Sequence, residues 1–224
     1  MTTTKALLFD LDGTLIDTAQ NFQAIINALR EKNHLPPLDI APVRLATSQG
    51  ASALAALGWD ATLNDPHFTQ YRQEFLRAYK QYIMENPVVF FPGIEEILEL
   101  IQKDIPWGIV TNKHAQFTRA IVARHPILAT AKTIVSGDTL EHNKPHPAPL
   151  LYACNELLIS PQYCLFIGDH QKDIQAGLRA GTDTGVALYG YLSPLDKPET
   201  WGANYTFANP AEIKEWIEKW MGTA

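Results

Sequence analysis

The segment 7–17, close to the amino terminus, constrains the fold of this chain more than any other feature. Three apolar residues lead directly into Asp10, a pattern typical of a buried strand in a parallel sheet. Asp12 follows two positions later, and side chains at this spacing on extended backbone point the same way. A buried strand that delivers two carboxylates predicts a functional site at its carboxyl end.

The two carboxylates require a positive charge between or beside them. At a separation of about 4 Å and an effective dielectric constant near 20, they would repel by roughly 4 kcal/mol. A metal site or an acid/base pair is therefore expected. Gly13 frees the backbone to turn sharply after the pair, and Thr14 adds a hydroxyl and an amide directed toward it. This segment taken alone could also be an ordinary strand that ends in an Asp-Gly turn.

Helical periodicity fills the stretch after this segment. Apolar residues at every third or fourth position predict a helix over 18–32, and an aromatic stripe predicts a long helix from Pro66 to Asn86 whose aromatic side chains belong to the core. Weaker helical segments are expected from Ala41 and over 53–57. No strand pattern occurs between Ile16 and Val88, so 17–87 is expected to be an inserted helical cap.

The second half of the chain alternates between apolar strands and amphipathic helices. This alternation predicts an α/β fold, a doubly wound (Rossmann-like) parallel sheet built from 1–16 and 88–224. The expected strands are 107–110, 133–135, 164–167, 184–188 and 205–207. One helix is expected to begin at Pro92-Gly93. Four further helices are expected over 115–124, 147–158, 172–180 and 210–221.

Polar residues gather directly after the apolar strands, where open parallel sheets bind their ligands. They are Thr111, Asn112 and Lys113, then Lys144, then Asp169 and Asp173. Each group alone has an ordinary explanation: a helix cap, an exposed lysine, a turn. Their occurrence in order after successive strands, together with Asp10 and Asp12, is what points to a site.

These groups resemble a known family. The run Asp10-Leu11-Asp12-Gly13-Thr14-Leu15 is similar to the first motif of the haloacid dehalogenase superfamily in its phosphatase form, and the later groups are similar to its other three motifs in order. The resemblance covers the sheet and leaves the helical cap without a diagnostic motif. It implies a phosphatase, a phosphoric monoester hydrolase, that acts through an aspartyl-phosphate intermediate.

The resemblance also implies roles for individual residues. Asp10 is the expected nucleophile and Asp12 the acid and base, while Lys144 and Thr111 stabilise the transferring phosphoryl group. Asn112 is expected to orient its surroundings. The implied cofactor is Mg²⁺, held by Asp10, the backbone carbonyl of Asp12, and Asp169, with Asp173 in the outer part of the metal site. The cap is expected to close over the site.

The helical cap, together with the segments 111–113, 143–147 and 168–173, resembles more narrowly the phosphoglycolate phosphatase group. Within it, residues 189–191, 201–203 and the cap segment 70–82 resemble N-acetylmuramic acid 6-phosphate phosphatases of bacterial cell-wall recycling. His114 and the bend 48–50 depart from the family pattern. Both candidate substrates carry a carboxylate, and the basic residues expected to contact it are Arg44 and Lys113.

Three other hypotheses for the function of the chain stay open. These are a phosphoglycolate phosphatase acting on 2-phosphoglycolate, a phosphomutase of the β-phosphoglucomutase type, and a catalytically silent binding module. A dehalogenase needs no acid two residues after its nucleophile, so Asp12 argues against one.

Composition limits the partners and the compartment. The net charge of −6 and the lack of a Lys/Arg stripe argue against nucleic acid, and no apolar run approaches the roughly 18 residues of a membrane span. Four apolar residues before Asp10 are too few for a signal peptide. Cys154 and Cys164 lack metal-ligand spacing and indicate core thiols in a reducing compartment. We expect a cytoplasmic monomer or weak homodimer with a small phosphate ester as substrate.

Overall fold

The structure is a computed structural model that describes residues 5–222. The chain divides into two compact units. The sheet unit comprises Met1–Ile16 and Phe90–Ala224, and the helical unit comprises Asp17–Val89. The chain crosses between them at the two short strands β2 (Ile16–Asp17) and β3 (Val89–Phe90), which pair with each other.

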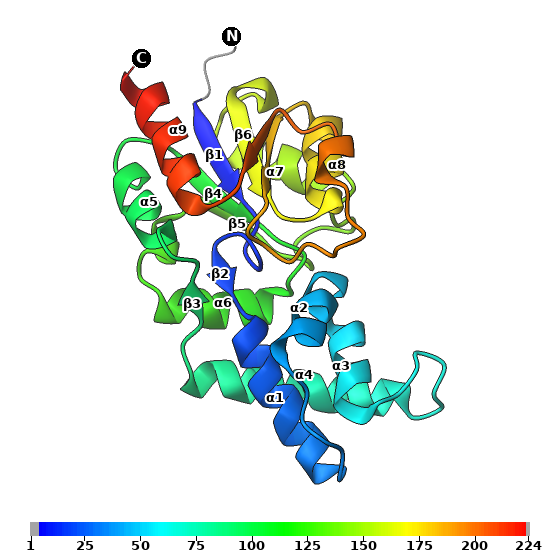
Figure 1. Ribbon diagram of the computed structural model, residues 1–224. Coiled ribbons are helices and arrows are strands. Elements are labelled where there is room, and N and C mark those ends of the chain that lie inside the picture. The colour runs from blue at the N-terminus through cyan, green and yellow to red at the C-terminus, as the bar shows by residue number, and fades with distance from the viewer. Residues whose placement is uncertain (1–4, 223–224) are drawn as a thin grey trace. The chain divides into compact units, whose positions relative to one another are not determined.

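The sheet unit contains a six-stranded parallel sheet in the order β5-β4-β1-β6-β7-β8, of which β5, β4, β1 and β6 are labelled in Figure 1. The predicted doubly wound α/β fold is therefore confirmed. Strand β1 is central, because Phe9 pairs with Ile109 of β4 on one side and with Ile167 of β6 on the other. The strands are β1 (Ala6–Phe9), β4 (Trp107–Val110), β5 (Thr133–Val135), β6 (Cys164–Gly168), β7 (Asp183–Ala187) and β8 (Tyr205–Phe207).

Helices cover both faces of this sheet. In Figure 1, α5 and α9 lie on one side of the sheet and α7 and α8 on the other. The apolar spacing explains the packing of α5, since Ile94, Ile97, Leu98 and Ile101 recur along one face of the helix and are fully buried. The helices are α5 (Ile94–Ile101), α6 (Ala115–Arg124), α7 (Ala148–Glu156), α8 (Gln171–Ala180) and α9 (Pro210–Gly222), with single 3₁₀ turns at Leu128–Thr130, Pro161–Tyr163 and Pro198–Thr200.

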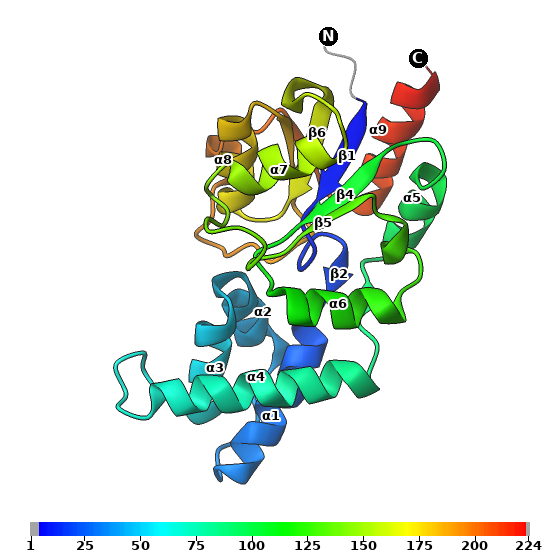
Figure 2. The same ribbon diagram turned by 180° about the vertical axis from the view of Figure 1, so that it is seen from behind.

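The helical unit packs four helices around an aromatic interior. Its long helix α4 crosses α1, which Figure 2 shows from behind. The ring of Phe22 on α1 lies 6.0 Å from that of Phe75 and 4.8 Å from that of Tyr79, centroid to centroid. Phe75 and Tyr79 of the predicted aromatic stripe are thus part of the core, whereas its other aromatic side chains, Phe68, Tyr71 and Tyr82, are half-buried. The helices are α1 (Ala19–Lys32), α2 (Ile40–Gln49), α3 (Ala51–Trp59) and α4 (Phe68–Glu85).

Two further sequence expectations concern the cysteines and membrane helices. Cys154 and Cys164 are free and buried in the core beside α7, with their Sγ atoms 3.5 Å apart. Their place in the interior agrees with the predicted core thiols. Between residues 5 and 222, none of the helices has the length and apolar character needed to cross a bilayer.

Candidate active site

The carboxyl ends of the central strands bring the predicted polar residues together. Asp10 follows β1 directly and its amide donates to the Ile167 carbonyl of β6 at 2.9 Å. Thr111 follows β4, and its amide donates to the Val135 carbonyl of β5 at 2.9 Å. Because parallel strands end at the same edge, residues far apart in sequence meet there.

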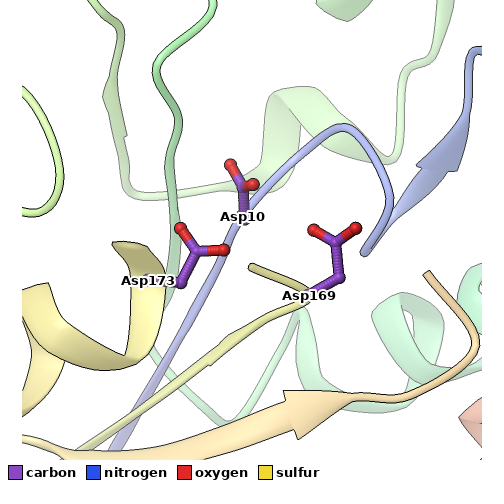
Figure 3. A group of neighbouring side chains, drawn as sticks. All are labelled: Asp10, Asp169 and Asp173. Atoms are coloured by element: carbon purple, nitrogen blue, oxygen red, sulfur yellow. The ribbon is translucent and has the colours of Figure 1, made fainter. Parts of the chain in front are cut away.

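Three aspartates form a compact acidic group at this edge. Figure 3 shows Asp10, Asp169 and Asp173, and each offers a carboxylate oxygen within 4.8 Å of the others. They come from three different elements: the end of β1, the end of β6 and the first turn of α8. Asp169 and Asp173 are buried, whereas the Asp10 side chain keeps 13% of its surface exposed. An incoming ligand can therefore reach Asp10.

Asp173 is held in place by the helix that carries it. Its Oδ2 accepts a hydrogen bond from the backbone amide of His170 at 3.0 Å, which forms part of a capping box at the start of α8. Its Oδ1 remains directed to Lys144, 2.7 Å away.

Lys144 connects two of the aspartates, Asp10 and Asp173. Its Nζ lies 2.8 Å from Asp10 Oδ1 as well as close to Asp173, and it donates to the Val110 carbonyl at 2.7 Å. The side chain is 2% exposed, so these contacts replace water around the ammonium group. Asn112 fixes the backbone of this lysine through two hydrogen bonds: its Nδ2 donates to the Lys144 carbonyl at 3.0 Å, and its Oδ1 accepts from the Lys144 amide at 3.1 Å. Asn112 therefore positions Lys144.

Asp12 forms an ion pair with a second lysine, Lys113. Lys113 Nζ lies 2.7 and 2.8 Å from the two oxygens of Asp12, and the lysine side chain is 7% exposed. The sequence required a positive charge beside the two aspartates, and the structure shows one lysine for each. The sequence did not indicate that Lys113, which was expected to contact a substrate carboxylate, would pair with Asp12. The only signal for this pairing was the need for a positive charge beside the two aspartates.

The other predicted substrate residues lie in different settings. Thr111 is buried beside the site and its Oγ1 accepts from the Lys113 amide at 3.2 Å. Arg44 belongs to the helical unit, where its Nη1 lies 2.9 Å from Asp17 Oδ2 and its side chain is 34% exposed. That Arg44 contacts a substrate stays a prediction.

Burial and crowding of like charges govern the protonation of the aspartates. Burial raises the pKa of Asp10 to about 6, with Lys144 opposing the shift and Asp173 adding to it. Burial, together with Asp10 and Asp173, raises the pKa of Asp169 well above its usual value. For Lys144 burial alone would lower the pKa, but the carboxylates of Asp10 and Asp173 outweigh it and raise the pKa. A negative charge is thus in excess here.

The donor set fits a small divalent cation. Three carboxylates (−3) and Lys144 (+1) sum to −2, which one divalent ion would neutralise. Hard oxygen donors of this kind suit Mg²⁺. Asp169 also lies against two glycines, Gly13 and Gly190, and a Cβ on either would overlap it. Gly13 has φ +85°, a conformation that glycine adopts without strain.

Comparison with known proteins agrees with this geometry. The family described as haloacid dehalogenase-like hydrolase matches residues 7–187, which include every residue of the acidic group and both lysines. The chain belongs to this family. The resemblance predicted from the sequence is confirmed, and with it the prediction that the chain is an enzyme.

Relatives within the haloacid dehalogenase-like hydrolases include phosphatases of two kinds. The chain is 40% identical over 218 residues to an N-acetylmuramic acid 6-phosphate phosphatase of Pseudomonas aeruginosa, covering 96% of this chain and 95% of the relative. It is 34% identical over 212 residues to a phosphoglycolate phosphatase of Xanthomonas campestris, covering 94% and 95%. A crystal structure described as a predicted phosphoglycolate phosphatase from Haemophilus somnus has a TM-score of 0.81 at 27% identity, covering 97% of this chain and 99% of that one.

Proposed function

We propose that this haloacid dehalogenase-like hydrolase is a Mg²⁺-dependent phosphatase that hydrolyses a small phosphate ester through an aspartyl phosphate. The observation that carries this proposal is the group of Asp10, Asp169 and Asp173, in which buried Lys144 bridges Asp10 and Asp173. A partly exposed carboxylate beside a fixed ammonium group and two deeper carboxylates supplies a nucleophile next to a cation site.

The residues of the site provide the steps of the reaction. Asp10 attacks phosphorus, so that a bond forms from its carboxylate oxygen while the bond to the leaving alcohol oxygen breaks. Lys144 holds the Asp10 carboxylate through its ammonium group and balances charge on the phosphoryl oxygens. Thr111, buried at the end of β4, offers its hydroxyl to those oxygens.

Asp12 acts as general acid in the first half of the reaction and as general base in the second. It gives its proton to the leaving alcohol, and then takes a proton from the water that attacks the aspartyl phosphate and regenerates Asp10. The two contacts from Lys113 Nζ fix the orientation of this carboxylate. When Asp12 carries its negative charge, Lys113 stabilises it at once, because the lysine is already in place.

Asp10, Asp169, Asp173 and the backbone carbonyl of Asp12 would hold Mg²⁺, which supplies a positive charge to the phosphoryl group when bound. The net charge of −2 on the three aspartates and Lys144 supports a divalent ion here. We propose that the helical unit is the cap of this enzyme, and that the enzyme acts in the cytoplasm without nucleic acid or membrane partners.

For the substrate, we propose N-acetylmuramic acid 6-phosphate. Two relatives with this activity in their names, at 40% and 36% identity, are more similar to the chain than the phosphoglycolate phosphatases compared with it, which are 30% to 35% identical. A groove of the helical unit, about 640 Å³, adds support because its polar lining is uncharged. Amides and a phenol suit the hydroxyl and acetamido groups of an amino sugar. The lining residues are Gln20, Asn21, Gln23, Ile40, Tyr82, Asn86, Pro87 and Val89.

The test is a comparison of kcat/KM for N-acetylmuramic acid 6-phosphate, N-acetylglucosamine 6-phosphate and 2-phosphoglycolate. The second compound is the matched control, since it keeps the amino sugar and lacks the carboxylate. We expect the first to be preferred. A preference for 2-phosphoglycolate would replace the substrate and leave the chemistry unchanged. Release of inorganic phosphate separates hydrolysis from a phosphomutase, which would return an isomeric sugar phosphate.

The same assay tests the metal. Activity is expected to disappear in EDTA, to return with Mg²⁺ and to be inhibited by Ca²⁺, whose looser and higher coordination would misplace Asp10. Full turnover in EDTA, measured with p-nitrophenyl phosphate, would refute the metal site. No turnover of any phosphate ester would favour a silent binding module.

A further inference from the structure

The turn that follows β7 reaches into the acidic group from a distant part of the chain. Tyr189 donates its hydroxyl hydrogen to the backbone carbonyl of Thr14, with the oxygens 2.9 Å apart. Two residues on, the backbone amide of Tyr191 donates to Asp169 Oδ2 at 2.7 Å. One short segment therefore contacts both the loop after Asp10 and an aspartate of the proposed cation site.

Gly190 makes these two contacts possible at once. A Cβ at this position would overlap the side chain of Asp169 and lie 2.5 Å from the carbonyl oxygen of Gly13. The glycine amide donates to the Ala187 carbonyl at 3.2 Å, which closes the turn. Asp169 is thus enclosed between Gly13 and Gly190, and any side chain on Gly190 would displace it.

Packing fixes the tyrosine in its donor role. The ring of Tyr189 meets the ring of Phe91 edge-on, with centroids 5.1 Å apart, and Phe91 is itself buried and bonded through its amide to the Leu15 carbonyl at 3.1 Å. Burial, and then the charge of Asp169, raises the pKa of Tyr189 above its ordinary value. The phenol stays protonated, so its hydrogen is always available to the Thr14 carbonyl.

We propose that Tyr189, Gly190 and Tyr191 form a clasp that holds Asp169 against the loop after Asp10, so that the cation site is already assembled before a cation binds. Tyr189 and Gly190 are positioning residues in this proposal, since neither supplies a ligand atom. The inference rests on the proposed function in one respect, that the ion is Mg²⁺. A carboxylate that need not be reordered on binding costs less conformational entropy, and loss of the clasp weakens affinity for the ion.

The experiment is isothermal titration calorimetry of Mg²⁺ into the full-length chain. Tyr189→Phe keeps the ring packing and removes the hydrogen bond, and we expect affinity for Mg²⁺ to fall about 3- to 10-fold. Gly190→Ala pushes Asp169 aside, and we expect a fall of about 10- to 100-fold. The matched control is Tyr205→Phe, at the first residue of β8 and packed on Trp216, which should bind Mg²⁺ within about twofold of wild type.

Circular dichroism and the melting temperature without Mg²⁺ separate positioning from simple stabilisation. A merely structural tyrosine would lower the melting temperature and leave Mg²⁺ affinity unchanged, and that result for Tyr189→Phe would overturn the proposal. If Gly190→Ala does not fold, Tyr189→Phe decides alone. If the wild type binds Mg²⁺ and hydrolyses p-nitrophenyl phosphate, and Tyr189→Phe has the same activity and the same affinity for Mg²⁺, only the clasp is refuted. Wild type that binds no Mg²⁺ sinks the clasp and the proposed metal chemistry together.

Discussion

The ends of the sheet strands and the helical unit differ in how their charged side chains are paired. Buried Arg30 of the helical unit donates to the backbone carbonyls of Pro36 and Leu57, whereas the buried lysines at the strand ends meet carboxylates. At the strand ends, charged groups are nearly buried: Lys144 is 2% exposed and Lys113 7%, and each meets a carboxylate within 3 Å. In the helical unit, the ion pair of Arg44 with Asp17 leaves a third of the arginine exposed, and the groove is lined by neutral amides and a phenol.

This difference has a physical reason. A buried charge tolerates few substitutions, because removing its partner leaves an unpaired charge in a low-dielectric setting. The strand ends therefore carry residue patterns that identify the chemistry. Exposed neutral groups cost little to exchange, so the helical unit can vary and carries no motif. Changes at the strand ends should abolish turnover, whereas changes in the helical unit should alter which substrate is used.

The largest effect is expected at Asp10. Asp10→Asn keeps the shape of the side chain, but an amide does not attack phosphorus, so kcat should fall by about 10³-fold or more. Steady-state rates with p-nitrophenyl phosphate, and circular dichroism as the control for folding, measure this. A kcat within tenfold of wild type would remove Asp10 as the nucleophile.

Asp12→Asn sharpens the assignment of the acid. Loss of the proton donor should lower kcat about 10²- to 10⁴-fold for sugar phosphates, and less for p-nitrophenyl phosphate, whose leaving group needs little protonation. Lys113→Met should follow the same trend more weakly, and Lys113→Arg should restore part of the rate, since the arginine can again contact the carboxylate. Equal losses for good and poor leaving groups would contradict this role.

The burial of Asp10 predicts an unusual dependence of stability on pH in the metal-free protein. Its pKa is raised from 3.8 to about 6 in the folded state, so between these values the folded chain binds more protons than the unfolded chain. The free energy of unfolding should then fall as pH rises from about 4 to 6. At pH 7 in EDTA, Asp10→Asn should be more stable than wild type by up to roughly 3 kcal/mol, with the two converging near pH 4.

Urea denaturation at pH 4, 5, 6 and 7 measures this difference. A metal-free Asp10→Asn that is less stable than wild type at pH 7 would show that the ion pair with Lys144 outweighs the cost of burial.

The smallest effect is expected in the groove of the helical unit. Gln20→Ala and Asn86→Ala should raise KM for N-acetylmuramic acid 6-phosphate about 3- to 10-fold, each by loss of a hydrogen bond, and leave kcat with p-nitrophenyl phosphate unchanged. Gln81→Ala, which removes an exposed amide of α4 outside the groove, is the control. If all three variants behave alike, the groove does not bind the sugar.

The amino-acid sequence by itself determined the alternation of strands and helices, the parallel sheet and the location of the polar groups at its edge. These follow from local patterns: apolar runs such as 164–167 form buried strands, and whatever follows them lies at the carboxyl ends. The two-residue strands β2 and β3 were not predicted, since two residues are too few to show a period.

Only the tertiary structure decided which side chains serve each other. Lys113 meets Asp12 across 101 positions of sequence, Tyr189 reaches Thr14 across 175, and Lys144 bridges two aspartates that come from different elements. Such pairings depend on the register of β1 with β4 and β6 and on glycines that leave space for Asp169. A local pattern places a charge at the edge of the sheet, but distances of 2.7 to 2.9 Å between its partners arise from packing of the whole sheet unit.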